Sequence, residues 1–180
     1  SHVLSDGNGS MQFFKYLICT YINIKHKLNL NIPLNDSTVT EKEKDDFKTF
    51  DKDDLDLKIS RRKIGYKLKM LKKDTTKHDV IEMHLPVDKI KKVSKKYETT
   101  ITIYLTAVFI KSIIDNVRMK DLKKPIGVSI PVDLRNIFPS HTSRNFFYTV
   151  LVSYKYHDGD TLEDIIKEIS LQLKENLEKD

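Results

Sequence analysis

Residues 126–156 have the sequence IGVSIPVDLRNIFPSHTSRNFFYTVLVSYKY and contain the two apolar runs on which the fold prediction depends. The first run, residues 126–134, follows Pro125. The second, residues 145–156, alternates and is rich in β-branched and aromatic side chains, which pack well on a pleated surface. The stretch therefore predicts two strands joined by a loop.

Two further segments have strand-like patterns. Residues 64–70 alternate apolar with charged or small side chains, which is the two-residue period of a half-buried strand. Residues 78–86 form a short run that ends at Pro86, a residue that cannot donate a ladder hydrogen bond. We expect a strand in each segment.

Apolar residues at helical spacing predict four helices, at about residues 10–27, 87–99, 102–118 and 161–178. Ser10 is the candidate N-cap of the first, and Thr161 with Asp164 resembles a capping box for the last. From residue 78 onward the order of elements is β, α, α, β, β, α. This order predicts an α/β fold, a two-layer α+β sandwich in which helices cover a mixed β-sheet.

The composition is that of a globular protein, with 39% hydrophobic and 32% charged residues in a chain of 180. Its formal net charge of +6 attracts anionic partners only if the excess lies on one face. A single cysteine, Cys19, excludes an intrachain disulfide framework and a multi-cysteine metal site, and predicts a cytoplasmic location. No run of about 18 apolar residues predicts a membrane span.

The middle of the chain is highly charged. Residues 35–58 mix acids and lysines without a sustained period, which indicates a linker or surface loop and no metal site. Residues 58–77 carry nine basic side chains and one acid, Asp74. They fit a solvated edge strand or a cationic patch for a phosphorylated ligand, and nucleic acid is not favoured because no aromatic stacking platform is interleaved.

Residues 1–17, SHVLSDGNGSMQFFKYL, place a glycine-bearing loop directly before a helical pattern. An EF-hand calcium loop is excluded, because its first and twelfth ligand positions hold Leu4 and Lys15. A dinucleotide fingerprint is excluded by Gln12 in place of its third glycine. A third interpretation uses the pattern H-x-x-x-D-G, which is short enough to occur often by chance and is weak evidence alone. In acyl transfer, its neutral imidazole would take a proton from an alcohol, amine or thiol that attacks a thioester.

Together, SHVLSDGNGSMQFF and the later PVDLR…RNFF resemble motifs of the chloramphenicol acetyltransferase-like superfamily. That superfamily includes alcohol O-acetyltransferases, wax ester synthases and the condensation domains of peptide synthetases. The resemblance implies that His2 is the catalytic general base, Asp6 the structural aspartate that holds the loop by a buried salt bridge, and Gly7 the loop glycine. It also implies that Arg135 and Asn145 line or brace the acyl-donor channel; His141, in the loop between the motif strands, is a further candidate for substrate contact.

The chain departs from the family pattern in three ways. Ser1 stands where the family has its first histidine, Arg144 stands where it has a glycine, and its D-F-G-W-G type motif is not found. We expect a fragment that starts at the motif, near the end of the N-terminal lobe, and that lacks nearly all of that lobe and the C-terminal end. Its parts would be the motif loop and helix in residues 1–34, a linker or crossover in residues 35–77, and an incomplete C-terminal lobe in residues 78–180.

The resulting prediction is a coenzyme A-dependent acyltransferase that transfers an acetyl or other acyl group from acyl-CoA to a small alcohol or amine. Acyl-CoA would be a co-substrate, with no permanently bound cofactor and no metal, and the isolated fragment would be inactive. Two alternatives stay open: a non-catalytic binding or scaffold lobe of the same fold, and a basic nucleic-acid-binding domain resting on residues 58–77.

Overall fold

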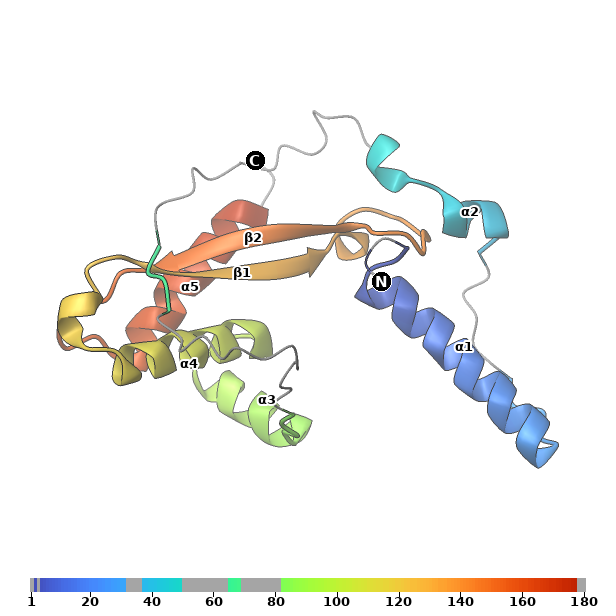
Figure 1. Ribbon diagram of the computed structural model, residues 1–180, viewed down its shortest axis with the longest axis horizontal. Coiled ribbons are helices and arrows are strands. Elements are labelled where there is room, and N and C mark those ends of the chain that lie inside the picture. The colour runs from blue at the N-terminus through green and yellow to red at the C-terminus, as the bar shows by residue number, and fades with distance from the viewer. Residues whose placement is uncertain (1, 3, 32–36, 50–64, 69–81, 178–180) are drawn as a thin grey trace, which may run out of the picture. The chain divides into compact units, whose positions relative to one another are not determined.

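The structure is a computed structural model that describes residues 2, 4–31, 37–49, 65–68 and 82–177 (Figure 1). The chain divides into two compact units. The first comprises Ser1–Asp56 and Pro131–Val150, and the second comprises Leu57–Ile130 and Leu151–Asp180. Most of the predicted basic segment, residues 58–77, lies outside the described residues.

The two strands predicted from residues 126–156 are confirmed. Strand β1 is Ile126–Asp133 and strand β2 is Phe147–Tyr154, and they pair in an antiparallel two-stranded sheet. In β2 the buried side chains are those of Val150, Val152 and Tyr154, which follow the two-residue period of the sequence. Helices combined with this small sheet agree with the α/β class, at the level of a mixed helix and sheet fold.

The two other predicted strands are not found where the chain is described. Residues 65–68 have no regular secondary structure, although the Tyr66 N–H donates to the Pro125 carbonyl oxygen at 2.8 Å. Residues 82–86 are also irregular, so the strand prediction is wrong there. The physical reason is that Met83 and Leu85 are 73% and 46% exposed, so no buried face rewards strand pairing.

The second unit is built on three helices, α3 Val87–Lys96, α4 Ile101–Asn116 and α5 Leu162–Leu177. Helix α4 contacts both α3 and α5. Helix α5 is tied to β2, because the Gln172 side chain both donates to the Ser153 carbonyl oxygen and accepts from its N–H, each at 2.8 Å. Buried aliphatic side chains from these elements form the core: Ile103, Ala107, Ile110, Ile113, Ile114, Ile126, Ile130, Val152, Ile165, Ile166 and Ile169.

The predicted capping box of the last helix is confirmed. The Asp164 carboxylate accepts from the Thr161 N–H at 2.9 Å, and the Thr161 hydroxyl oxygen accepts from the Asp164 N–H at 3.3 Å. These reciprocal bonds satisfy donors that would otherwise be orphaned at a helix start. The helix therefore begins where the local pattern predicts.

The first unit begins with helix α1, Gly7–His26, and its start differs from the prediction. Asp6, not Ser10, is the N-cap: its carboxylate accepts from the Gly9 N–H at 3.0 Å. Within the segment interpreted as a linker, the structure has helix α2, Val39–Glu43, and a 3₁₀ turn, Asp46–Lys48. A capping box between Thr38 and Glu41 starts α2.

Helix α1 is mostly exposed to solvent. Gly9 is its one buried residue, although an apolar stripe runs along the helix. The exposed apolar side chains include those of Met11, Phe13, Phe14, Leu17, Tyr21 and Ile24. Within the described residues, no helix is both long and apolar enough to cross a membrane.

Gly9 lies at the tightest contact of the first unit. A Cβ atom added there would lie 2.2 Å from the Ser143 carbonyl oxygen and 2.2 Å from the Ser5 Oγ atom. The Ser5 hydroxyl in turn donates to that same carbonyl oxygen at 2.6 Å. The start of α1 can approach residue 143 this closely only because residue 9 has no side chain.

We expect Gly9→Ala to lower the free energy of unfolding by about 2 kcal/mol, because the methyl group collides with backbone that cannot rotate away. The matched control is Gly7→Ala, since an added Cβ there meets nothing within 4 Å. That variant should be neutral or slightly stabilising, because alanine favours the helix over glycine. Urea unfolding of both variants checks this, and equal midpoints for the two would contradict it.

Candidate active site

The H-x-x-x-D-G loop borders a cavity of about 380 Å³ in the first unit. Motif residues form one side, and the end of β1 with the start of β2 forms the other. The lining residues are His2, Asp6, Gly7, Asn8, Pro131, Val132, Asp133 and Phe147. All three residues singled out in the motif therefore meet at one cavity.

Asp6 is buried and joins three parts of the first unit. Its Oδ1 atom caps α1, and its Oδ2 atom accepts from the Phe146 N–H at 2.8 Å and from Arg135 Nη1 at 2.8 Å. Burial by itself would raise the pKa of this carboxyl. The hydrogen bonds from Gly9, Phe146 and Arg135 outweigh it, so the pKa lies below its usual value and Asp6 is ionised at neutral pH.

Arg135 is the partner that makes burial of Asp6 possible. Its side chain is 9% exposed, and its Nη1 atom lies 2.8 Å from both Asp6 and Asp133. The Nε and Nη2 atoms donate to the carbonyl oxygens of Thr142 at 3.0 Å and Arg144 at 2.6 Å. The guanidinium therefore braces the loop between the strands from inside the unit and does not line the cavity.

The loop between β1 and β2 is also anchored from α2 and the 3₁₀ turn. The Thr142 hydroxyl donates to the Lys44 carbonyl oxygen at 2.6 Å, and the Ser140 hydroxyl donates to the buried Asp46 carboxylate at 2.5 Å. The Phe47 ring meets Phe146 edge-on, with ring centroids 5.1 Å apart. The charged segment thus supports the loop that carries the second motif.

His2 is exposed, and it is held through its backbone and its ring. The Asn145 side-chain amide donates to the His2 carbonyl oxygen at 2.5 Å. The imidazole lies against the Phe147 ring, with centroids 6.0 Å apart and planes tilted by 55°. His2 lines the cavity, and no hydrogen bond to its imidazole comes from the residues that the structure describes.

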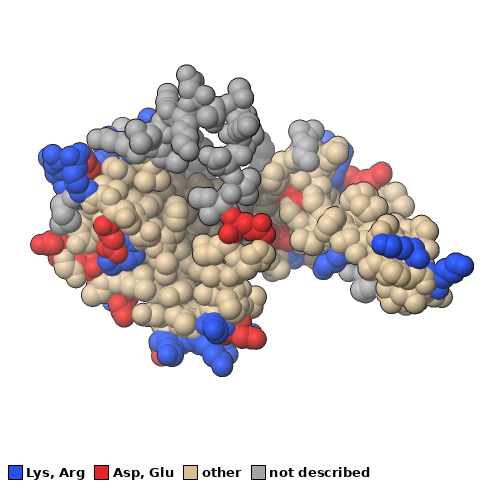
Figure 2. Space-filling model, turned by 60° about the horizontal axis from the view of Figure 1, so that its bottom comes forward, with Lys and Arg blue, Asp and Glu red and all other residues tan. Residues whose placement is uncertain are grey.

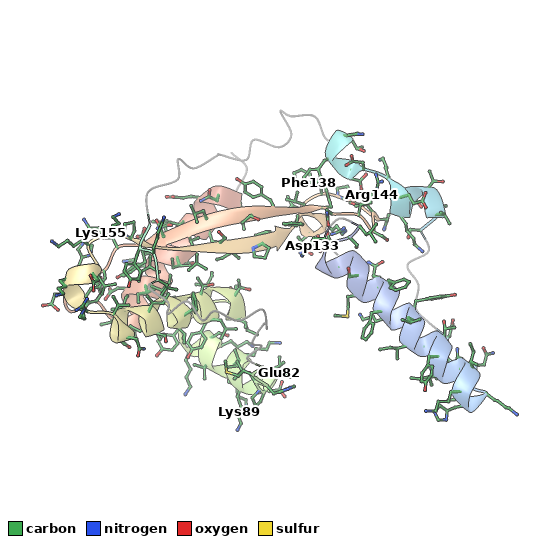
Figure 3. The ribbon with its side chains drawn as sticks, viewed as in Figure 1. Glu82, Lys89, Asp133, Phe138, Arg144 and Lys155 are labelled. Atoms are coloured by element: carbon green, nitrogen blue, oxygen red, sulfur yellow. The ribbon has the colours of Figure 1, made fainter. Side chains whose placement is uncertain are left out.

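The remaining sequence candidates lie outside the cavity lining. His141 is exposed and near Glu41. Arg144 lies at the turn of the loop (Figure 3), and its backbone does not have a positive φ; its N–H donates to the Thr142 hydroxyl at 3.1 Å. The arginine in place of the family glycine therefore causes no left-handed backbone strain.

Five cavity residues were not singled out individually from the sequence: Asn8, Pro131, Val132, Asp133 and Phe147. The Asn8 amide donates to Asp133 Oδ2 at 2.7 Å, which links the start of α1 to the end of β1. Hydrogen bonds from Asn8 and Arg135 outweigh burial and lower the pKa of Asp133. Asp133 lies two residues before Arg135 in the PVDLR motif. This position in the motif is the sequence signal that could have identified Asp133 as a residue of the cavity.

In the part of the chain that the structure describes, no cluster of three or more histidine, cysteine, aspartate or glutamate residues could hold a metal ion. The chemical groups gathered at the cavity are an accessible imidazole, an aromatic wall and an ionised, fully engaged pair of carboxylates. Such a set can bind a small molecule with an apolar part and accept one proton from it.

Replacing Arg135 tests how far this unit depends on the buried ion pair. We expect Arg135→Met to lower the free energy of unfolding by about 3–5 kcal/mol, because Asp6 then stays buried without its countercharge. The control is Arg118→Met, which breaks the pair with Asp121 at a side chain that is 69% exposed. An exposed ion pair contributes less than about 1 kcal/mol to the free energy of unfolding. If urea unfolding gave similar losses for Arg135→Met and Arg118→Met, the buried pair would not have the stabilising role predicted for it.

The lowered pKa of Asp6 also predicts the direction of acid sensitivity. A carboxyl with a lower pKa in the folded state stabilises the fold above its unfolded pKa of about 3.9, and this contribution is lost as the pH falls through the lower folded value. The free energy of unfolding should therefore fall between pH 7 and about pH 3, and fall less in Asp6→Asn. Urea titrations at both pH values measure this; an equal fall in the two proteins would count against it.

Comparison with known proteins relates this geometry to one family. Neither a curated protein nor a solved structure gives a match to the chain. A family model described as alcohol acetyltransferase matches residues 47–177, which is more than half of the chain and includes β1, Arg135, Asn145 and β2. The matched range does not include His2 or Asp6. The chain belongs to the alcohol acetyltransferase family.

Proposed function

We propose that the protein transfers an acetyl or other acyl group from acyl-CoA to an alcohol or amine, with His2 as the general base. The observation that carries this proposal is the position of the His2 imidazole. It lines the cavity beside Phe147, while its loop is anchored through Asp6 and Asn145. Family membership supports acyl transfer in general, and the resemblance of the two motifs supports the thioester donor.

In the proposed reaction, an imidazole nitrogen of His2 takes the proton of the acceptor hydroxyl or amine. The acceptor atom attacks the thioester carbonyl carbon, and a new C–O or C–N bond forms in a tetrahedral intermediate. The C–S bond then breaks, and the leaving thiolate takes the proton from the imidazolium. Asp6 does not carry this proton, because its two oxygens accept three hydrogen bonds and its low pKa keeps it ionised.

We also propose that activity requires a further lobe of the same protein, which packs on the apolar side of α1. The exposed Phe14, Leu17 and Tyr21 support this, since a wide apolar helix face is normally covered. In the family resembled by the motifs, the channel lies between two lobes. The 180-residue chain alone should then turn over much more slowly than a protein that contains it together with such a lobe.

The test is an assay of acetyl transfer from acetyl-CoA to a panel of alcohols and amines. The measured signal is the free thiol that each transfer releases. His2→Ala should lower kcat/KM by about 10²–10⁴-fold, the usual contribution of a general base. The control is His157→Ala, because His157 is an exposed histidine of the second unit. Unchanged turnover in His2→Ala would remove the base from the mechanism.

The alternative is a non-catalytic lobe that binds an acyl thioester. It is favoured by one observation: no described residue donates to or accepts from the His2 imidazole, so its tautomer is not fixed. Calorimetric binding of acetyl-CoA with no turnover of any acceptor, in the protein with its upstream sequence, would support this alternative over catalysis.

A further inference from the structure

The surface of helix α3 has a charge pattern that the proposed acyl transfer does not use. Five of the ten residues of α3 are lysines: Lys89, Lys91, Lys92, Lys95 and Lys96. At 100° of rotation per residue they fall on one side of the helix, which also carries Asp88, the single acid of α3. All five lysines are exposed.

The opposite side of α3 packs within the second unit, which fixes the direction of the lysines. Helix α3 contacts α4, Ser94 is 2% exposed, and Ile90 and Val93 are half-buried. After the helix, the Tyr97 ring stacks on Tyr104 of α4, with centroids 5.6 Å apart. The lysine side of α3 therefore faces solvent.

Large apolar side chains are exposed immediately beside these lysines. Met83 is 73% exposed, Leu85 46% and Val87 68%, and they alternate with Glu82, His84 and Pro86 along an extended stretch that leads into α3. Figure 3 labels Glu82 in this stretch and Lys89 in α3. We define the α3 surface as these three apolar residues and the five lysines.

The α3 surface carries a net positive charge. None of the five lysines forms an ion pair with any described residue. The acids near it are fewer: Asp88 lies on the same side of α3, and Glu98 and Glu163 line a cavity with Lys96. The surface therefore combines an excess of cations with exposed hydrocarbon, and a matching partner needs both anionic groups and an apolar layer.

We propose that the α3 surface docks the protein on a lipid bilayer that contains anionic lipids. The lysines would lie at the phosphate level, and Met83, Leu85 and Val87 would enter the boundary between headgroups and acyl chains. This is the arrangement by which basic amphipathic segments bind at a membrane interface without crossing it. A nucleic acid fits less well, because its backbone offers no apolar layer and the nearby aromatic ring of Tyr97 is already stacked on Tyr104.

The same unit offers a matched control surface. Lys120, Lys123 and Lys124 are also exposed and close in sequence, but the apolar residue between them, Leu122, is 5% exposed. On the face shown in Figure 2, basic side chains stand in separate groups between larger areas of other residues. The control thus has similar charge, while the apolar side chain among its lysines is buried.

The test is co-sedimentation of the full chain with phosphatidylcholine vesicles containing about 30% phosphatidylserine. We expect binding to these vesicles, little binding to pure phosphatidylcholine, and release by salt. Each lysine near the surface contributes roughly fivefold to partitioning, so Lys91→Glu/Lys92→Glu/Lys95→Glu should reduce it by about 100-fold. Lys120→Glu/Lys123→Glu/Lys124→Glu has the same charge change and should reduce it by less than about tenfold.

A second variant reports on the apolar residues. The sequence has no tryptophan, so Met83→Trp provides a single fluorophore. On anionic vesicles its emission should shift to the blue and be quenched by lipids brominated on their acyl chains.

Three results would overturn the proposal. The first is that the protein does not bind the vesicles. The second is that the two lysine triple variants lose vesicle binding to the same extent. The third is that the protein binds duplex DNA or RNA through the α3 lysines but does not bind vesicles. The experiment measures binding and not turnover, so it tests the membrane proposal independently of the proposed role of His2.

Discussion

The buried carboxylate of Asp6 is the interaction on which the first unit depends. It caps α1 through the Gly9 N–H, fixes the start of β2 through the Phe146 N–H, and pairs with Arg135 at 2.8 Å. A buried carboxylate needs such partners, because an unpaired ion in a dry interior is strongly destabilising. Arg135 is supported in the same way, by Asp133 and by the carbonyl oxygens of Thr142 and Arg144. Helix, strand and loop are therefore positioned by one small network of charges.

This dependence explains which parts of the fold could be predicted. The strands at residues 126–156 and the capping box at Thr161 follow from side chains within a few residues of one another, and both are confirmed. The start of α1 was predicted at Ser10, because Ser10 precedes the apolar stripe. The helix begins at Gly7, because the Asp6 carboxylate caps it through the Gly9 N–H; the same carboxylate also pairs with Arg135, 129 positions away in the sequence. The prediction of a strand at residues 82–86 is wrong for a different reason. The local strand pattern is present, but no described element packs against Met83 and Leu85 to bury them.

Some residues of the candidate site could be named from the sequence, and others could be identified only from the structure. His2, Asp6 and Gly7 could be named from the sequence because they lie within one short motif, and whether His2 acts as a base stays a prediction. Asn8, Asp133 and Phe147 also line the cavity; they lie within the two motifs, but the sequence does not show that they face one another. Asn8 faces Asp133 only after α1 and β1 have been brought together by the Asp6–Arg135 pair. Packing between distant segments thus determines most of the cavity wall.

The same network distinguishes the Asp6 carboxylate from the His2 imidazole. A carboxylate whose oxygens accept three hydrogen bonds, and whose pKa they lower, is a poor proton acceptor at neutral pH. His2, only four residues earlier, is held by its backbone and by a ring contact, and its imidazole accepts no hydrogen bond from a described residue. Rigid anchoring of the loop and freedom of the ring nitrogens are both needed for a base that must take up and return a proton. In this protein the Asp6 carboxylate holds the loop, and the imidazole of His2, four residues earlier in the H-x-x-x-D-G pattern, lines the cavity; its action as a base stays a prediction.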